Sequence, residues 1–145
     1  MPIRLVWHRR DLRLHDNALY SDLDDTTSVA SLFVFNHIDF EPRPSTCRPE
    51  EWDAVNIGPH AARILLESVD DLRQSLRSIG GELMVRQGSP AHIIPEIIQE
   101  LGATEVCWNE EPGIYEQHLS KQVSTAIRQR FTNVRIQTSM QYTLY

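Results

Sequence analysis

The sequence predicts an α/β fold, a doubly wound five-stranded parallel sheet with helices on both faces. Two observations lead to this prediction. Short apolar runs rich in strand-forming residues alternate with segments that repeat apolar residues at helical spacing. The runs are almost continuously apolar, as expected of strands that are covered on both faces. Regular alternation of this kind is typical of a parallel sheet with crossover helices.

The first two strands are expected at residues 3–8 (I-R-L-V-W-H) and 28–35 (S-V-A-S-L-F-V-F). Between them, residues 15–23 predict a short helix, and Asp16 or Asn17 is available to cap its first turn. The connection between the two strands is therefore expected to be short.

Residues 36–57 predict a long surface loop, because three prolines interrupt every regular pattern there. A strong helix is expected at 59–79, ended by Gly80-Gly81. Its apolar positions recur at three- and four-residue steps and predict one buried face, formed by Ile64 or Leu65, Val69, Leu72, Leu76 and Ile79.

In the second half, three predicted strands alternate with two predicted helices. A strand at 82–86 precedes a helix at 90–101, with Ser89 as its cap, Pro90 at its first position and Gly102 as its stop; Pro95 predicts a kink inside it. A strand at 104–108, a helix at 115–130 and a strand at 133–138 complete the order β-α-β-α-β-α-β-α-β.

Composition predicts one compact domain over residues 1–145. The 14 Lys and Arg residues against 20 Asp and Glu give a net charge of -6, which argues against nucleic-acid binding by this domain alone.

No apolar run is long enough to cross a membrane, and the first strand begins almost at Met1. We therefore expect neither membrane association nor a signal or transit peptide. The expected location is the cytoplasm or nucleus. Cys47 and Cys107 are expected to be ordinary reduced thiols.

Residues 7–17 read W-H-R-R-D-L-R-L-H-D-N directly after the first predicted strand. This segment is similar to the opening signature of the photolyase/cryptochrome family, W-F-R-R-D-L-R-L-x-D-N, with His8 where phenylalanine is most usual. Three further segments resemble the family in the same order: G-P-H-A-A-R-I-L-L-E-S-V-D-D-L-R at 58–73, G-S-P at 88–90 and W-N-E-E at 108–111. The resemblance covers the whole chain and is closest to the plant-type and DASH-type branches.

The resemblance implies a Rossmann-like domain that binds a light-harvesting antenna chromophore and docks against a helical FAD-binding domain. The latter domain is expected to be absent from residues 1–145 and to pair with them in cis or in trans. The implied roles are photoreactivation DNA repair or photoreception. The domain alone is expected not to be catalytic, and to be part of a deoxyribodipyrimidine photo-lyase-like enzyme only when joined to an FAD domain.

A ligand is expected where strand order reverses, because ligands of open α/β sheets bind beyond the carboxyl ends of the strands at that point. The loops at 8–13 and 109–115 should meet there. They bring together three arginines and three glutamates, namely Arg9, Arg10, Arg13, Glu110, Glu111 and, one helical turn on, Glu116. Two interpretations are open: these residues close the loops by ion pairs, for example Arg10 or Arg13 with Asp11, Glu110 or Glu111, or they line a pocket for a planar chromophore.

The resemblance assigns roles to three of these residues. Glu116 matches the family glutamate that contacts the pterin of 5,10-methenyltetrahydrofolate, while Arg10 and Glu111 match positions that line the pocket for 8-hydroxy-5-deazaflavin. A pterin edge carries N–H donors, which suit a carboxylate because it only accepts hydrogen bonds. This chain has Pro112-Gly113-Ile114 where the family more usually has a Y-E-P-Y type of sequence.

Two other functions remain as alternatives: a universal-stress-like domain that binds ATP or AMP, and a truncated protein-interaction module. The chain has no G-x-G-x-x-G, no G-x-x-x-x-G-K-[ST] and no G-x-S-x-G, so no motif supports a nicotinamide site, a P-loop or a hydrolase nucleophile. Histidine spacing predicts no metal site. Trp7 and Trp108, at strand ends, are expected in the core rather than in an electron-transfer chain with Trp52.

Overall fold

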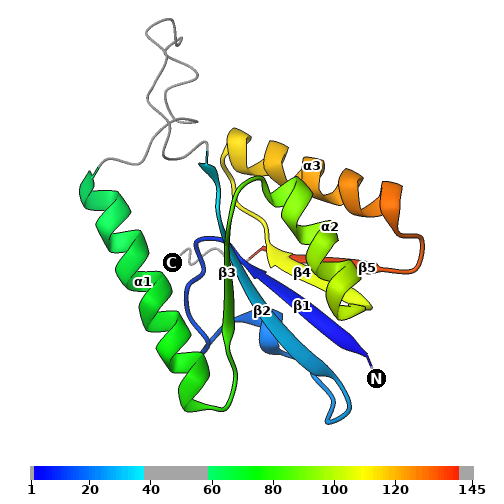
Figure 1. Ribbon diagram of the computed structural model, residues 1–145, viewed down its shortest axis with the longest axis horizontal. Coiled ribbons are helices and arrows are strands. Elements are labelled where there is room, and N and C mark those ends of the chain that lie inside the picture. The colour runs from blue at the N-terminus through cyan, green and yellow to red at the C-terminus, as the bar shows by residue number, and fades with distance from the viewer. Residues whose placement is uncertain (1, 38–58, 141–145) are drawn as a thin grey trace, which may run out of the picture.

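The computed structural model describes residues 2–37 and 59–140, which form a parallel sheet between helical layers (Figure 1). The strand order is β3-β2-β1-β4-β5, and each neighbouring pair is parallel. The strands are β1 (Ile3–His8), β2 (Ser28–Phe35), β3 (Leu83–Gln87), β4 (Glu105–Asn109) and β5 (Arg135–Ser139). The helices are α1 (Pro59–Ser78), α2 (Pro90–Leu101) and α3 (Ile114–Arg130). The predicted fold class is confirmed.

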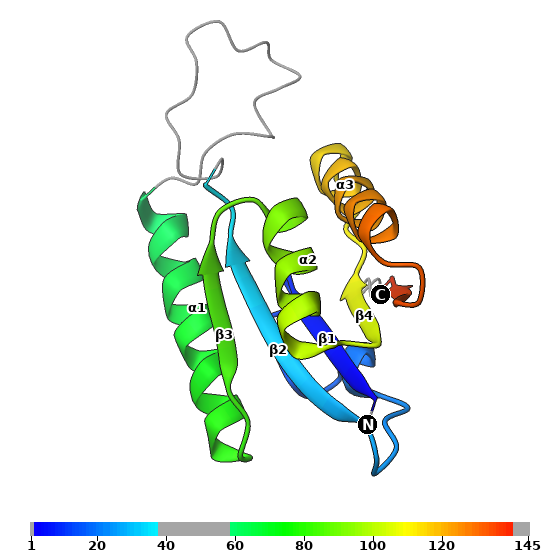
Figure 2. The same cartoon turned by 45° about the vertical axis from the view of Figure 1, so that its right-hand side comes forward.

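The two faces of the sheet carry different helices, as Figures 1 and 2 show. Leu32 of β2 packs in the cluster that joins the sheet to α2 and α3, which also contains Trp7 and Trp108. The next residue of β2, Phe33, points to the opposite face and packs against Val69, Leu72 and Leu76 of α1. Alternate residues of β2 therefore pack into two separate cores, one on each face of the sheet. This explains why the strand is apolar on both sides.

The residues at the two ends of α2 explain where this helix begins and ends. Ser89 stands at its N-cap position, Pro90 follows at the first helical position, and Gly102 ends the helix in a left-handed conformation with φ 65°. Ser89 makes no capping hydrogen bond with its side chain. Pro95 lies within the helix and is buried, as is its neighbour Ile94.

The predicted helix at 15–23 is wrong, because only a single 3-10 turn, η1 (Ala18–Tyr20), forms there. Asn17 caps that turn, accepting a hydrogen bond from the Leu19 N–H at 3.2 Å. Asp16 and Asp22 have φ values of 51° and 55°. This left-handed backbone on either side of η1 does not permit a continuous right-handed helix.

The buried face of α1 is narrower than predicted. Ile64 is 64% exposed, and Ile79, which lies beyond the last residue of α1, is 72% exposed. Leu65 takes the partly buried position instead of Ile64. Residues 38–58, which contain most of the predicted loop with Cys47 and Trp52, lie outside the described residues. None of the described helices is long and apolar enough to span a membrane.

Candidate functional site

The loops that follow β1 and β4 meet at the edge of the sheet where strand order reverses, as predicted. Strands β2 and β3 lie on one side of β1, whereas β4 and β5 lie on the other. Adjacent β1 and β4 therefore end side by side. In an open parallel sheet this is the position where ligands bind.

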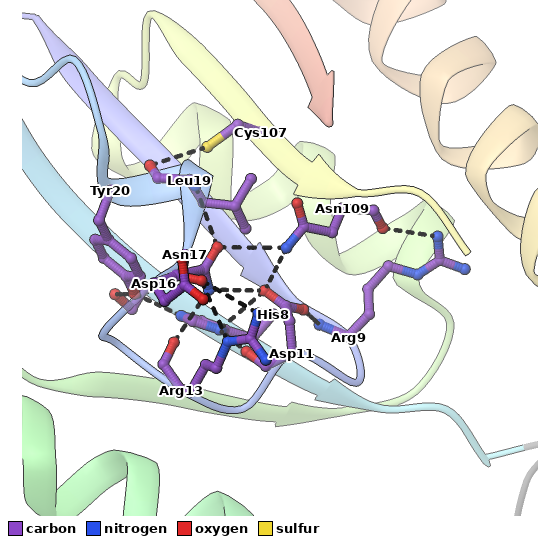
Figure 3. Close-up of polar contacts among 11 residues, drawn as sticks. His8, Arg9, Asp11, Arg13, Asp16, Asn17, Leu19, Tyr20, Cys107 and Asn109 are labelled. Carbon is purple, nitrogen blue, oxygen red and sulfur yellow. Dashed lines mark hydrogen bonds and ion pairs between the residues drawn. The ribbon is translucent and has the colours of Figure 1, made fainter. Parts of the chain in front are cut away.

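Asp11 joins the two loops (Figure 3). Its Oδ1 accepts the backbone N–H of Arg9 at 3.0 Å, and its Oδ2 accepts Nδ2 of Asn17 and Nδ2 of Asn109, both at 3.0 Å. Asn109 is 4% exposed and also donates to Oδ1 of Asn17 at 3.3 Å. Because one carboxylate serves three donors, it fixes the loop after β1 against the end of β4.

Arg9 makes a second connection between the loops. It is 8% exposed, and its guanidinium donates to the backbone oxygens of Glu116 at 2.8 Å and Asn109 at 3.4 Å. The same guanidinium lies 5.1 Å from the ring centroid of Trp7. Burial lowers the pKa of Arg9, while surrounding carboxylates, Glu111 foremost, favour its charge. Arg9 is thus a structural cation inside the loops.

Arg10 and Glu116 form an ion pair across the two loops, with 3.0 Å between Nη2 and Oε1. The Arg10 side chain is 76% exposed, whereas that of Glu116 is 17% exposed. The expectation that Arg10 or Arg13 pairs with Asp11, Glu110 or Glu111 is not met. Arg10 pairs with Glu116, and Arg13 donates to the backbone oxygen of Asp16.

Glu111 lies beside this pair, half-buried and close enough to interact electrostatically with Arg9 and Arg10. Burial raises the pKa of Glu111, although the two arginines oppose this effect. Among the described residues its carboxylate has no hydrogen-bond partner. Glu110 differs, because its Oε1 accepts hydrogen bonds from Trp108 Nε1 at 3.1 Å and Ser120 Oγ at 2.6 Å.

Gly113, the N-cap residue of α3, makes room for the Glu116 carboxylate. A Cβ atom added at Gly113 would overlap Oε2 of Glu116. The φ of Gly113 is -64°, a value open to any residue, so glycine matters here only for the space that it leaves to the Glu116 carboxylate. The departure of Pro112-Gly113-Ile114 from the family pattern therefore bears directly on Glu116.

A groove of about 500 Å³ opens on the other side of Arg10. It lies between the loop after β1 and α1, and its walls are Arg10, Asp11, Leu12, Arg13, Ile64, Glu67, Ser68 and Asp71. Neither Glu111 nor Glu116 lines it. Arg10 thus lies between Glu111 and Glu116, near the start of α3, and the open groove along α1.

Asn17 and Asn109 hold the loops together, a role that was not predicted. Asn17 was expected only as a helix cap, and Asn109 was noted only as part of the W-N-E-E segment. Trp7 and Trp108 are buried as predicted, with ring centroids 5.4 Å apart. Cys107 is a buried free thiol.

Comparison with known proteins agrees with the family resemblance of the sequence motifs. Residues 4–145 match the family model described as DNA photolyase. A cryptochrome DASH of Gloeobacter violaceus is 37% identical over 124 residues, which is 85% of this chain and 23% of that protein. The blue-light photoreceptor PHR2 of Arabidopsis thaliana is 33% identical over 132 residues, 90% of this chain and 28% of that protein. The chain thus spans about a quarter of the length of these relatives.

The solved structures show the same fold. The crystal structure of a Synechocystis sp. PCC6803 cryptochrome superposes with a TM-score of 0.82 over 97% of this chain and 27% of that one, at 23% identity. An archaeal photolyase from Sulfolobus tokodaii, described as having two FAD molecules with the implication of a novel light-harvesting cofactor, gives a TM-score of 0.73 at 19% identity over 98% of this chain and 30% of that one.

Proposed function

This chain belongs to the DNA photolyase family, and on that basis we propose that it binds an antenna chromophore and docks with an FAD-binding helical domain, in cis or in trans. The complete flavoprotein would serve photoreactivation DNA repair or blue-light photoreception. The FAD belongs to the helical domain and not to this one. Family membership supports this function over the two alternatives, the nucleotide-binding domain and the interaction module.

The observation that carries the proposal is the arrangement of Arg10, Glu111 and Glu116. The Arg10–Glu116 pair neutralises two of the three charges, with 3.0 Å between the paired atoms. Glu111 remains a half-buried acceptor at the same rim, without a hydrogen-bond partner among the described residues. A carboxylate that is partly desolvated and not hydrogen-bonded is a strong acceptor for the N–H donors of a ligand.

These residues fit both proposed antennas, 5,10-methenyltetrahydrofolate and 8-hydroxy-5-deazaflavin. Each contains a planar heteroaromatic ring whose edge carries polar groups. Glu111 and Glu116 would accept N–H donors of such an edge, and the exposed guanidinium of Arg10 would donate to its oxygen atoms. When bound, the chromophore supplies the absorption of near-ultraviolet or blue light.

The chain itself would hold the chromophore in place. Asp11 and Arg9 tie the rim loops to β4 and α3 through hydrogen bonds of 2.8–3.4 Å, so the rim side chains are mounted on a fixed base. A fixed orientation matters because excitation passes to the flavin by dipolar coupling, which depends on the angle between the two chromophores. No bond is made or broken in this domain, so it would not be an enzyme alone.

Binding can be tested by titrating the chain with each chromophore and following near-ultraviolet absorbance and induced circular dichroism. We expect one chromophore to bind and the E111Q and R10A variants to weaken that binding by about tenfold each, the effect of losing one charge-assisted hydrogen bond. R128A, at an exposed position near the far end of α3, is the matched control and should bind like the wild type. The proposal fails if neither chromophore binds to the chain alone and neither binds to a mixture of the chain with the helical domain of a relative.

A further inference from the structure

A chain of partly buried hydrogen bonds runs from β2 through Tyr20 and His8 to Asp11, in the loop that also carries Arg10 (Figure 3). Ser31 Oγ lies 2.8 Å from the Tyr20 hydroxyl, and that hydroxyl lies 2.5 Å from Nε2 of His8. On the other side of the ring, Nδ1 of His8 lies 3.1 Å from the backbone oxygen of Asp11. The His8 side chain is fully buried, and Ser31 is 3% exposed.

The chemistry of these groups assigns each proton. A backbone oxygen only accepts, so Nδ1 of His8 must carry the hydrogen and donate it to Asp11. In the neutral ring Nε2 then accepts from the Tyr20 hydroxyl, which accepts in turn from Ser31. Burial lowers the pKa of His8, which agrees with a neutral imidazole. Because Ser31 and His8 are buried, this is not the arrangement of an accessible nucleophile and its base.

The Asp11 oxygen is the point where this chain reaches the candidate site. It also accepts the backbone N–H of Arg13 at 2.9 Å, so two donors fix the turn of residues 11–13. The Asp11 carboxylate accepts the backbone N–H of Arg9, immediately before Arg10. The backbone position of Arg10 is therefore set by hydrogen bonds to the carboxylate and to the backbone oxygen of Asp11. His8 supplies one of the bonds to the backbone oxygen.

We propose that His8 is a positioning residue for the antenna site, by which we mean Arg10, Glu111 and Glu116. It acts through the hydrogen bond from its Nδ1 to the Asp11 backbone oxygen. The imidazole braces the turn against Tyr20 and β2, and so holds Arg10 where it meets Glu116. The binding part of this inference rests on the proposed function. The part that concerns the turn rests only on the contacts given above.

The two ends of the imidazole can be tested separately. The side-chain amide of asparagine lies where Nδ1 lies in histidine, whereas that of glutamine reaches the Nε2 position. H8N therefore keeps a donor for the Asp11 oxygen, and H8Q keeps only a partner for Tyr20. We expect hydrogen exchange at the Arg13 amide to be about tenfold faster in H8Q than in H8N, the effect of one buried hydrogen bond. The Val6 amide, in the middle of β1, reports global opening and should exchange equally in the two variants.

Three further measurements complete the test. Nitrogen-15 spectra of the wild type should show the tautomer with hydrogen on Nδ1, and Y20F should keep slow exchange at Arg13. The better-binding chromophore should bind H8N within about threefold of the wild type but H8Q about tenfold more weakly. H92F, at an exposed histidine of α2, is the control for substitution alone.

The outcomes separate this inference from the proposed function. Equal Arg13 exchange in H8N and H8Q, or hydrogen on Nε2 in the wild type, would overturn the role of His8 while leaving chromophore binding intact. A wild type that binds neither chromophore would overturn the proposed function, whereas the exchange comparison would still decide whether His8 holds the turn. Equal loss of binding in H8N and H8Q with different exchange would show that the turn does not control the antenna site.

Discussion

Asp11 and Asn109 lie 98 positions apart in the sequence and are joined by a hydrogen bond of 3.0 Å from Asn109 Nδ2 to Asp11 Oδ2. The bond crosses from the loop after β1 to the end of β4, the two neighbouring strands at which strand order reverses. Asn109 Oδ1 is buried without a hydrogen-bond partner among the described residues. The Asn109 side chain is therefore held through its Nδ2, which donates to Asp11 and, at 3.3 Å, to Asn17 Oδ1.

Replacing Asp11 by asparagine should destabilise the protein. In D11N, the side-chain NH2 group would face either the N–H donors of Asn17 and Asn109 or the N–H of Arg9. An NH2 group cannot accept a hydrogen bond from these donors, so they would be left unpaired. We expect a loss of about 1–3 kcal/mol in the free energy of unfolding, the range for leaving buried polar groups unpaired. Urea denaturation measures it. D71N, at an exposed position of α1, should unfold at the wild-type midpoint, and a D11N midpoint equal to the wild type would refute the anchoring role.

The sequence predicts the sheet, its helices and the meeting of two loops because these depend on apolar periodicity and on a general rule of strand order. It does not predict the Asp11–Asn109 bond, since local patterns carry no information about side-chain pairing between distant segments. The same limit explains Arg10, whose partner is Glu116 on α3. The helix expected at 15–23 was wrong because the left-handed φ of Asp16 and Asp22 is not visible in residue periodicity.

Cys107 should not react in the native protein. Burial raises the pKa of its thiol to about 12, so almost none is present as the reactive thiolate near neutral pH. In a C47S variant, which leaves one cysteine, a thiol-specific disulfide reagent should label Cys107 only after urea unfolds the chain. Labelling at equal rates with and without urea would contradict the buried position.

A methyl group at residue 113 should disturb the antenna site more than the fold. In G113A the new Cβ would take the space of Glu116 Oε2, and the flexible carboxylate would move away from Arg10. We expect a stability change of about 1 kcal/mol or less and chromophore binding about tenfold weaker, as for a lost charge-assisted contact. I114A, at a side chain that is 88% exposed, is the neighbouring control. Unchanged binding in G113A would mean that Glu116 does not contact the chromophore.

Glu111 should show opposite effects on stability and on binding. Because burial raises its pKa above the ordinary value of 4.5, folding favours the protonated form. The ionised carboxylate therefore costs stability, and this cost appears as the pH rises from 4.5 through the raised pKa. E111Q removes the charge, so it should be more stable than the wild type near neutral pH, and the difference should vanish in acid.

Chromophore binding should depend on pH in the other direction. The ionised Glu111 accepts N–H donors, so the wild type should bind less well as the pH falls through the raised pKa of this group, starting at a higher pH than an unperturbed glutamate would allow. E111Q should bind weakly and without this pH dependence. Urea midpoints and chromophore titrations between about pH 4 and pH 7 measure both effects, with E96Q on an exposed turn of α2 as the control. An E111Q variant that loses stability at neutral pH, or that binds with the wild-type pH profile, would remove Glu111 from the site.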